Sequence, residues 1–234
     1  MEQFVRTKML VGEQGLNYLQ QSKVIVFGVG GVGSYTVEAL ARTGIGYLVL
    51  VDFDTIDVTN INRQLPALFS TVGKYKVDIL KERIRDINPQ AEVVIYKEKV
   101  SSENAGVFFK ENPAYVVDAI DMIKGKVAII ETALQLEVPI ISALGAGNRL
   151  DPSKLKIGEL SETSGSGCPL ARIMRRELKK RGIIKGVQVV YSTEQPLKNV
   201  RISSSRVPGS ISFVPSVAGL LLAARVINDL LKKC

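Results

Sequence analysis

The run Gly28-Val29-Gly30-Gly31-Val32-Gly33 joins an apolar segment to a region that is expected to be helical. Glycines at this spacing allow a tight turn and let backbone N–H groups approach phosphate oxygens, which the start of a helix also attracts. Asp52 ends the next apolar run, where its carboxylate can accept hydrogen bonds from ribose hydroxyls. The pattern predicts a nucleotide site built from Gly28, Gly30, Gly31, Gly33 and Asp52. The structural alternative is a strand-to-helix turn that holds no ligand.

The elements that would position these residues alternate between apolar strands and amphipathic helices. Such alternation predicts a mostly parallel sheet with helices on both faces, and ligands at the carboxyl ends of its strands. We therefore expect an α/β fold, a doubly wound Rossmann-like sheet with a C-terminal extension of mixed strands and helices. Strands are predicted at 23–27, 47–51, 92–96, 115–118, 139–144 and 187–192, and helices near the N-terminus, at 32–43, 74–87, 104–110, 123–136 and 169–181, and from 214 onward.

Length and composition favour one globular domain over residues 1–234, with a nucleotide-binding core at 1–145 and a basic segment at 146–234. Two cysteines and no histidine exclude a disulfide framework and an ordinary cysteine zinc site. The N-terminus lacks an apolar signal core, so we expect a cytoplasmic protein. The apolar stretch 213–224 is interrupted by Pro215 and is expected to be too short to span a membrane, so a buried or interface helix is predicted there.

The net charge of +8 is unevenly distributed along the chain. Residues 1–145 hold 15 basic and 17 acidic side chains, whereas residues 146–234 hold 16 basic and 6 acidic ones. An excess of this kind predicts a polyanionic partner for the C-terminal part, with nucleic acid first and a membrane surface second. The Gly/Ser-rich segment 161–167 is typical of a mobile linker.

The predicted helix at 169–181 carries its basic residues on one side and apolar residues on the other. This side is either the solvated face of an amphipathic helix or a surface that binds nucleic acid, and the sequence favours neither. The candidate substrate-binding residues are Arg172, Arg175, Arg176 and Lys179.

Further polar residues follow Asp52, in the run from Asp54 to Gln64 and in the run 71–76. Together with the glycine turn and the segment 117–121, they resemble the adenylating superfamily of ThiF, MoeB and the ubiquitin-activating enzymes. This resemblance covers about residues 1–145 and implies ATP and Mg²⁺ as cofactors.

Adenylation of a carboxylate builds negative charge at the α-phosphorus of ATP, so cations are needed there. The resemblance implies the following roles: Arg63 and Lys76 stabilise the phosphates, Asp121 holds Mg²⁺, Asn60 orients phosphate or nucleophile, Asp52 and Asp54 bind the ribose and its surroundings, and Arg6 reaches into the site of a partner in a homodimer.

Each of these residues has a structural alternative. Asp54 and Asp57 are suited to cap the following turn, and we prefer that interpretation for Asp57. Arg63 could be an ordinary surface residue, and Asp121 could cap the helix that starts at Ile123. A cation at the start of a helix is mildly unfavourable, which a functional duty of Lys76 would explain.

The segments 158–163, 169–172, 189–194 and 208–215 extend the resemblance to the family of tRNA threonylcarbamoyladenosine dehydratases. Enzymes of that family adenylate a carboxylate attached to a tRNA adenosine, and an internal attack then closes a ring and releases AMP. The implied partner is tRNA, and a sulfur-relay protein is a further candidate. An aspartate usually stands where this chain has Cys168, so no catalytic role is assigned in that loop.

Three other functions are left open by the sequence. An adenylating enzyme could activate the C-terminal glycine of a small carrier protein, although this chain lacks paired Cys-x-x-Cys motifs. The glycine turn and Asp52 would also suit a nicotinamide-dependent oxidoreductase, which leaves Asn60, Arg63 and Lys76 unexplained. The last alternative is a non-catalytic RNA-binding or redox-sensing module.

Overall fold

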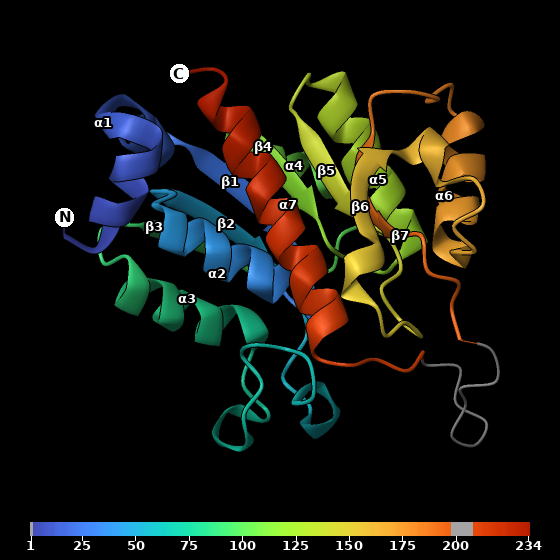
Figure 1. Ribbon diagram of the computed structural model, residues 1–234, viewed down its shortest axis with the longest axis horizontal. Coiled ribbons are helices and arrows are strands. Elements are labelled where there is room, and N and C mark those ends of the chain that lie inside the picture. The colour runs from blue at the N-terminus through green and yellow to red at the C-terminus, as the bar shows by residue number, and fades with distance from the viewer. Residues whose placement is uncertain (1, 198–207) are drawn as a thin grey trace.

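The structure, a computed structural model, describes residues 2–197 and 208–234 and has one seven-stranded sheet at its centre (Figure 1). The strand order is β3-β2-β1-β4-β5-β7-β6, and only β6 runs antiparallel to its neighbour. The predicted fold class is confirmed. The strands are β1 (Lys23–Phe27), β2 (Tyr47–Val51), β3 (Glu92–Tyr96), β4 (Tyr115–Asp118), β5 (Ile140–Ala143), β6 (Leu155–Glu159) and β7 (Gln188–Ser192).

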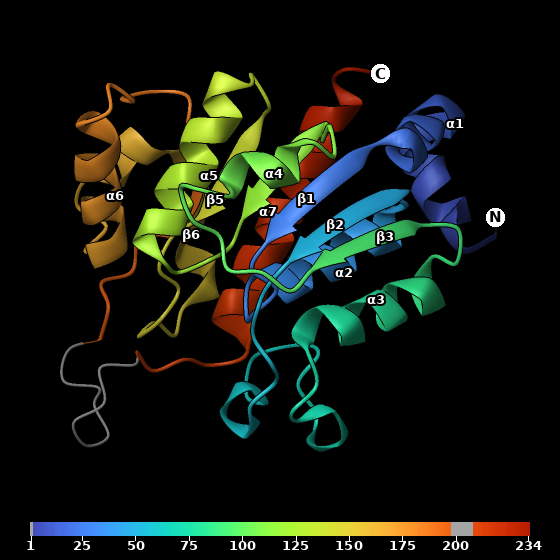
Figure 2. The ribbon, with the colours of Figure 1, turned by 180° about the vertical axis from the view of Figure 1, so that it is seen from behind.

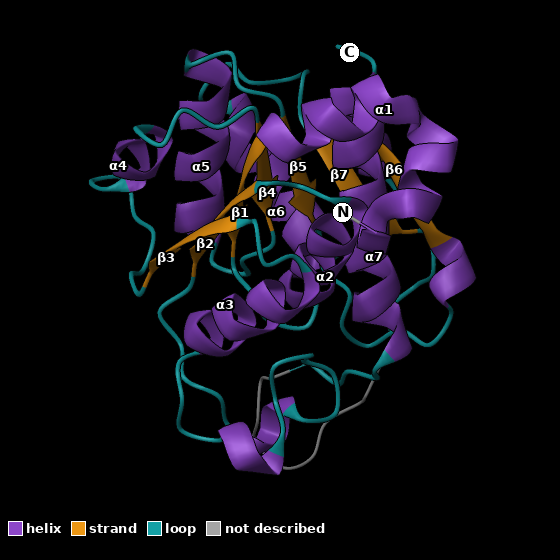
Figure 3. Cartoon of the chain, turned by 90° about the vertical axis from the view of Figure 1, so that its left-hand side faces the viewer, coloured by secondary structure: helices purple, strands orange, loops and turns teal. Residues whose placement is uncertain are grey.

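Helices cover both faces of the sheet (Figures 1–3). On one face pack α2 (Gly33–Thr43), α3 (Lys76–Ile87) and α7 (Phe213–Leu231), and on the other pack α4 (Ala105–Phe109), α5 (Ile123–Gln135) and α6 (Pro169–Lys179). The N-terminal helix α1 (Val5–Gln21) packs beside the end of α7 and is interrupted at Gly12, whose backbone is not helical.

The central strands are apolar on both sides because both of their faces are buried. In β1, Val24 and Val26 belong to the core under α2, α3 and α7, whereas Ile25 and Phe27 belong to the core under α4, α5 and α6. Neighbouring strands keep the same register, so that Phe27 lies beside both Val51 and Asp118. The strand order reverses between β1 and β4, and a doubly wound sheet opens a crevice at that place.

Two elements of the C-terminal part differ from the sequence-based expectations. Strand β6 was not predicted, because at the sheet edge its residues are exposed or half-buried and their apolar pattern is weak. The segment 161–167 is not a simple linker, since a 3-10 turn spans Leu160–Thr163 and the side chains of Thr163 and Ser166 are buried. Both side chains make hydrogen bonds that composition does not reveal.

Helix α7 begins at Phe213, one residue before the predicted start, and extends beyond the apolar stretch 213–224. Pro215 stands in its first turn, where a missing N–H has no helical partner to lose, so the helix continues to Leu231. Within the described residues it is the one helix long and apolar enough, by length and composition alone, to cross a membrane. Half of that apolar window is buried in the structure, which agrees with the predicted buried or interface helix. It packs along α2 and over the sheet (Figure 1).

Candidate active site

A cleft of about 600 Å³ opens at the carboxyl ends of β1, β2, β4 and β5, at the reversal of strand order. Loops from both parts of the chain line it, including 143–147 and 208–210. The structure therefore brings most of the predicted site residues together. Those that line the cleft are Gly28, Gly30, Gly31, Asp52, Asp54, Asn60, Arg63, Lys76 and Asp121.

The glycine turn after β1 is fixed by close backbone contacts. Gly28 has a φ of +80°, which favours glycine, and a Cβ there would lie 2.9 Å from the carbonyl group of Ala119. Gly33 begins α2, and a Cβ on it would lie 1.8 Å from the carbonyl oxygen of Gly28. No larger residue fits this position without moving the backbone. The turn consequently delivers the first N–H groups of α2 to the floor of the cleft.

The Asp52 carboxylate holds this turn in place. Its Oδ2 accepts a hydrogen bond from Val29 N at 2.8 Å, and its Oδ1 accepts one from Asp54 N at 2.9 Å. Burial raises the pKa of Asp52, while the charge of Lys76 and the two backbone donors act in the opposite direction. Each carboxylate oxygen has a second lone pair that can accept a hydrogen bond from a ribose hydroxyl. The ribose contact of Asp52 stays a prediction.

Lys76 is the first residue of α3, two residues later than predicted, and is 5% exposed. Its Nζ forms an ion pair with Asp54 Oδ2 at 2.7 Å. Asp54 therefore holds the lysine side chain at the cleft and does not cap the following turn. This pair also offsets the unfavourable position of a cation at a helix start.

Arg63 and Asn60 lie in the loop after β2. Arg63 Nη1 donates hydrogen bonds to Thr59 O at 2.9 Å and to Asn62 Oδ1 at 2.8 Å, which leaves further guanidinium donors for a ligand. Asn60 Oδ1 accepts from Asp57 N at 3.1 Å as half of a capping box. The preferred interpretation of Asp57 as a cap is confirmed, because its Oδ1 accepts from Thr59 N.

Asp121 is exposed in the loop between β4 and α5. The N-cap of α5 is Met122 and no side chain caps this helix, so the alternative role for Asp121 as a cap is wrong. No group of three His, Cys, Asp or Glu side chains that could hold a metal is found among the described residues. A single carboxylate nevertheless suits Mg²⁺, which is usually bound by one or two carboxylates together with substrate phosphates.

The sequence analysis did not predict the buried ion pair that fixes the loop with Asp121. Asp118 and Lys126 are both fully buried, with 2.9 Å between Oδ2 and Nζ. Ser142 Oγ donates to the same Asp118 oxygen, and Lys126 Nζ donates to the carbonyl of Ile120. The sequence signal was a lysine directly before the apolar run 127–130, on a helix face that must be buried.

Gln64 ends the run that resembles the adenylating superfamily, and no role was predicted for it. It is 8% exposed and lines the cleft, its Nε2 lies near Gly30, and its Oε1 is buried without a partner among the described residues. A buried acceptor of this kind is suited to a donor on a bound ligand.

Arg149 organises the wall of the cleft that comes from the C-terminal part. This guanidinium is 3% exposed and donates to the carbonyl oxygens of Gly145, Ser166 and Glu194. The loops after β5, before α6 and after β7 are thereby tied together. Backbone carbonyls carry no residue signature, so the sequence contained no signal for this contact.

Cys168 has a structural position at the start of α6. The side chain is 5% exposed and caps α6, with Sγ accepting from Ala171 N at 3.5 Å. A Cβ on Gly145 would lie 3.1 Å from this sulfur, so the start of α6 packs against the cleft wall.

Two predicted sets lie outside the cleft. Arg6 is exposed on α1 and Gly33 lies beneath the turn, so neither is among the lining residues. The basic residues lie on α6, whose predicted apolar face is correct because Met174 and Leu178 are buried. Arg172, Arg176 and Lys179 are exposed, and Arg175 is half-buried with a hydrogen bond to Thr163 Oγ1.

Comparison with known proteins gives a likeness over almost the whole chain. A model described as ThiF family matches residues 4–233. A Bacillus subtilis (strain 168) protein named tRNA threonylcarbamoyladenosine dehydratase is 44% identical and covers 99% of this chain and 96% of its own length.

Two solved structures of E. coli tRNA N6-threonylcarbamoyladenosine dehydratase are also similar. The complex with AMP has a TM-score of 0.91 at 34% identity, and the complex with ATP has a TM-score of 0.91 at 33% identity. Each covers 99% of this chain and 95% of its own. The likeness therefore includes the segment after Gly145.

Proposed function

Because the chain belongs to the ThiF family, we propose that it is an ATP-dependent enzyme that dehydrates threonylcarbamoyladenosine in tRNA. The observation that carries this proposal is the 44% identity over nearly the full length to a protein named for that reaction. The cleft supports it, because a glycine turn, two cations and an exposed acid surround one space large enough for a nucleotide.

The reaction has two steps. In the first, the threonylcarbamoyl carboxylate attacks the α-phosphorus of ATP and pyrophosphate leaves, which gives an acyl adenylate. In the second, a nucleophile of the same threonylcarbamoyl group attacks the acyl carbon, loses its proton, closes a ring and expels AMP. One carboxylate oxygen leaves with the AMP, so the modified nucleoside loses the elements of water.

The residues of the cleft have distinct tasks in this scheme. Arg63 and Lys76 stabilise the charge that develops on the phosphates, and the N–H groups of the glycine turn bind the phosphate oxygens. Asp52 holds the glycine turn in its conformation, and Asp54 holds Lys76 in position. The side-chain oxygen of Asn60 is used in the capping box, so its NH₂ group is the part that donates to a phosphate or to the nucleophile.

Asp121 would hold Mg²⁺, whose charge offsets that of the triphosphate when the ion is bound. Its side chain lines the cleft and is solvent-exposed, as an ion that keeps several waters requires. The loop that presents it is fixed by the buried Asp118–Lys126 pair.

The decisive experiment incubates the purified protein with ATP, Mg²⁺ and tRNA from cells that lack this activity. We expect AMP to form and the modified adenosine to lose the mass of one water molecule. Pyrophosphate release that depends on a carrier protein with a C-terminal glycine, and not on the tRNA, would instead select the carrier-activating alternative.

We further propose a homodimer in which Arg6 completes the site of the partner subunit. Helix α1 carries Arg6 together with three exposed apolar side chains, Val5, Met9 and Leu10, the last two 80% and 90% exposed. Exposed apolar side chains that gather in one patch are typical of protein interaction surfaces.

Mixed dimers test this arrangement. Arg6→Ala and Lys76→Ala should each inactivate the enzyme, and mixing the two variants should restore activity at the site that receives Arg6 from one subunit and Lys76 from the other. If Arg6 acts within its own chain, the mixture stays inactive.

A tRNA substrate also leads us to propose a cytoplasmic location, whereas a sulfur-relay partner stays an expectation from the resemblance.

A further inference from the structure

A second pocket, of about 320 Å³, lies along α6 beyond the cleft. Helix α6 connects the two hollows, because Leu170 near its start lines the cleft and Arg175 and Lys179 near its end line the second pocket. Leu160 and Val187 are buried side chains that form its apolar floor. Its size and apolar lining are those of a small-ligand pocket.

Glu159 lines this pocket, and one of its carboxylate oxygens has no hydrogen-bond partner among the described residues. Glu159 Oε1 accepts a hydrogen bond from Gln188 Nε2 at 2.6 Å, whereas Glu159 Oε2 is buried without a hydrogen bond to any described residue. A buried acceptor without a donor costs stability, and a ligand that brings an N–H group would remove that cost.

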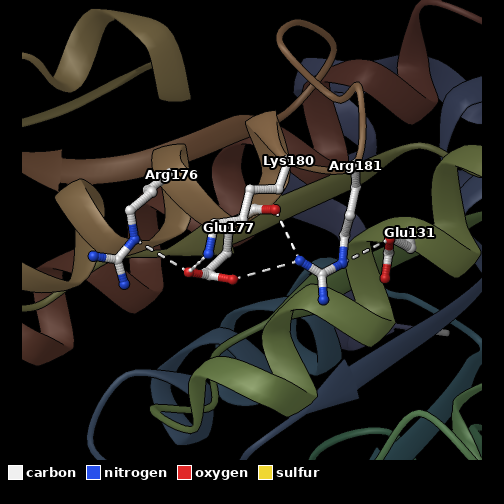
Figure 4. Close-up of polar contacts among 5 residues, drawn as sticks. All are labelled: Glu131, Arg176, Glu177, Lys180 and Arg181. Carbon is white, nitrogen blue, oxygen red and sulfur yellow. Dashed lines mark hydrogen bonds and ion pairs between the residues drawn. The ribbon is translucent and has the colours of Figure 1, made fainter.

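The cations of this region divide into two sets. Figure 4 shows the first, in which Glu177 pairs with Arg176, Lys180 and Arg181, and Arg181 pairs in addition with Glu131 of α5. These three cations are largely neutralised by the two carboxylates, so they contribute less to a field that attracts anions.

The second set has no such partners among the described residues. For Arg172, Lys179 and Lys185 the described part of the chain supplies no ion pair, and Lys179 and Lys185 both line the second pocket. Arg172, Arg175 and Lys179 follow one another at intervals of three and four residues, which places them on one face of α6. An unneutralised basic stripe therefore leads from the cleft to the pocket.

We propose that the second pocket holds one unpaired nucleotide of the tRNA while its modified adenosine is in the cleft. An amino group of the base donates to Glu159 Oε2, the base lies on the apolar floor, and the adjacent phosphates contact Arg172, Lys179 and Lys185. This inference rests on the proposed function. An acidic peptide suits the pocket less well, because its carboxylates would face Glu159.

The test measures tRNA affinity by fluorescence anisotropy over a range of salt concentrations. Lys179→Ala with Lys185→Ala should raise the Kd about tenfold and flatten the slope of log Kd against log salt by about 1 to 2. The matched control, Arg176→Ala with Lys180→Ala, removes the same charge from the paired set and should change the Kd less than about threefold.

Glu159→Gln provides a second, independent arm. The amide oxygen keeps its bond to Gln188, so an NH₂ group replaces the acceptor in the pocket. Loss of a negative charge alone would tighten the binding of a polyanion, but we expect the Kd to rise about tenfold with an unchanged salt slope. ATP affinity and melting temperature should match those of the unaltered protein.

The opposite results overturn the proposal. Equal losses in the two double variants would show that α6 contributes only diffuse charge, and tighter binding by Glu159→Gln would show that no donor meets this oxygen. Displacement of tRNA by polyglutamate from the parent, but not from the pocket variants, would assign the pocket to an acidic protein. A failure of the proposed function appears separately, as absence of tRNA-dependent AMP formation by the unaltered enzyme.

Discussion

Replacing Lys76 with alanine is the most direct test of the electrostatic arrangement in the cleft. The lysine is 5% exposed, and its Nζ lies 2.7 Å from Asp54 Oδ2. If this cation stabilises charge that develops only during adenylation, its loss should slow the reaction much more than it weakens ATP binding. The matched control is Lys74→Ala, which removes an exposed lysine two residues earlier.

The expected magnitudes follow from the surroundings of the pair. Loss of one preorganised charge at a transition state lowers kcat by about 10²- to 10³-fold, or about 3–4 kcal/mol. The side chain of Asp54 is 46% exposed, so water solvates its carboxylate once the lysine is gone. Loss of the ion pair should therefore reduce the free energy of unfolding by only about 1 kcal/mol or less.

Single-turnover formation of AMP from ATP and substrate tRNA measures the chemical step, and calorimetric titration measures ATP affinity. We expect Lys76→Ala to remain folded, to bind ATP within about tenfold of the unaltered enzyme and to lose most of its turnover. A variant with weaker ATP binding but unchanged turnover would refute the reasoning. So would an equal loss of turnover in Lys74→Ala.

Three further predictions concern other groups of the site. Burial raises the pKa of Asp52, so ATP affinity should fall as the pH decreases through that raised pKa, because protonation removes an acceptor of Val29 N. The contribution of Asp52 to stability changes with pH in the opposite direction: it is present in acid and is lost as the pH rises through the pKa of the folded protein. Over the acidic range, chemical unfolding should therefore show this stability contribution falling with rising pH, while titrations show ATP affinity rising. Lys126→Met leaves the Asp118 carboxylate buried and unpaired and should lower the free energy of unfolding by about 3–5 kcal/mol in urea titrations, with part of the loss recovered when Asp118→Asn is added. Gln64→Leu removes a buried acceptor without a partner and should leave the melting temperature unchanged or higher while ATP binds about tenfold more weakly; unchanged ATP affinity would contradict the proposed ligand contact.

Local patterns in the sequence predicted most of the fold and the side of the cleft formed by the glycine turn. The apolar runs of β1 and β2 and the glycine spacing between them encode neighbouring backbone, so Gly28 and Asp52 could be placed without knowledge of the rest. The end of α6 was predicted too far along the chain by two residues, because helix ends depend on hydrogen bonds that side-chain periodicity does not specify.

The contacts that the sequence did not reveal join distant segments. Arg149 bonds carbonyl oxygens 4, 17 and 45 residues away, and any residue supplies such an oxygen. The basic periodicity of α6 was visible, but its division into paired and unpaired cations was not. That division depends partly on Glu131, which belongs to another helix.

The direct pairing of β5 with β7 has a mechanical consequence. The loops that follow these two strands, on both sides of the segment boundary expected near residue 145, grow from adjacent strands of one continuous hydrogen-bonded sheet. Two parts of a chain that share one sheet cannot rotate apart about a hinge without breaking the hydrogen bonds between their adjacent strands. If the proposed reaction takes place in this cleft, we expect the motion that admits its substrate to be confined to connecting loops, such as 53–75, while the sheet stays intact.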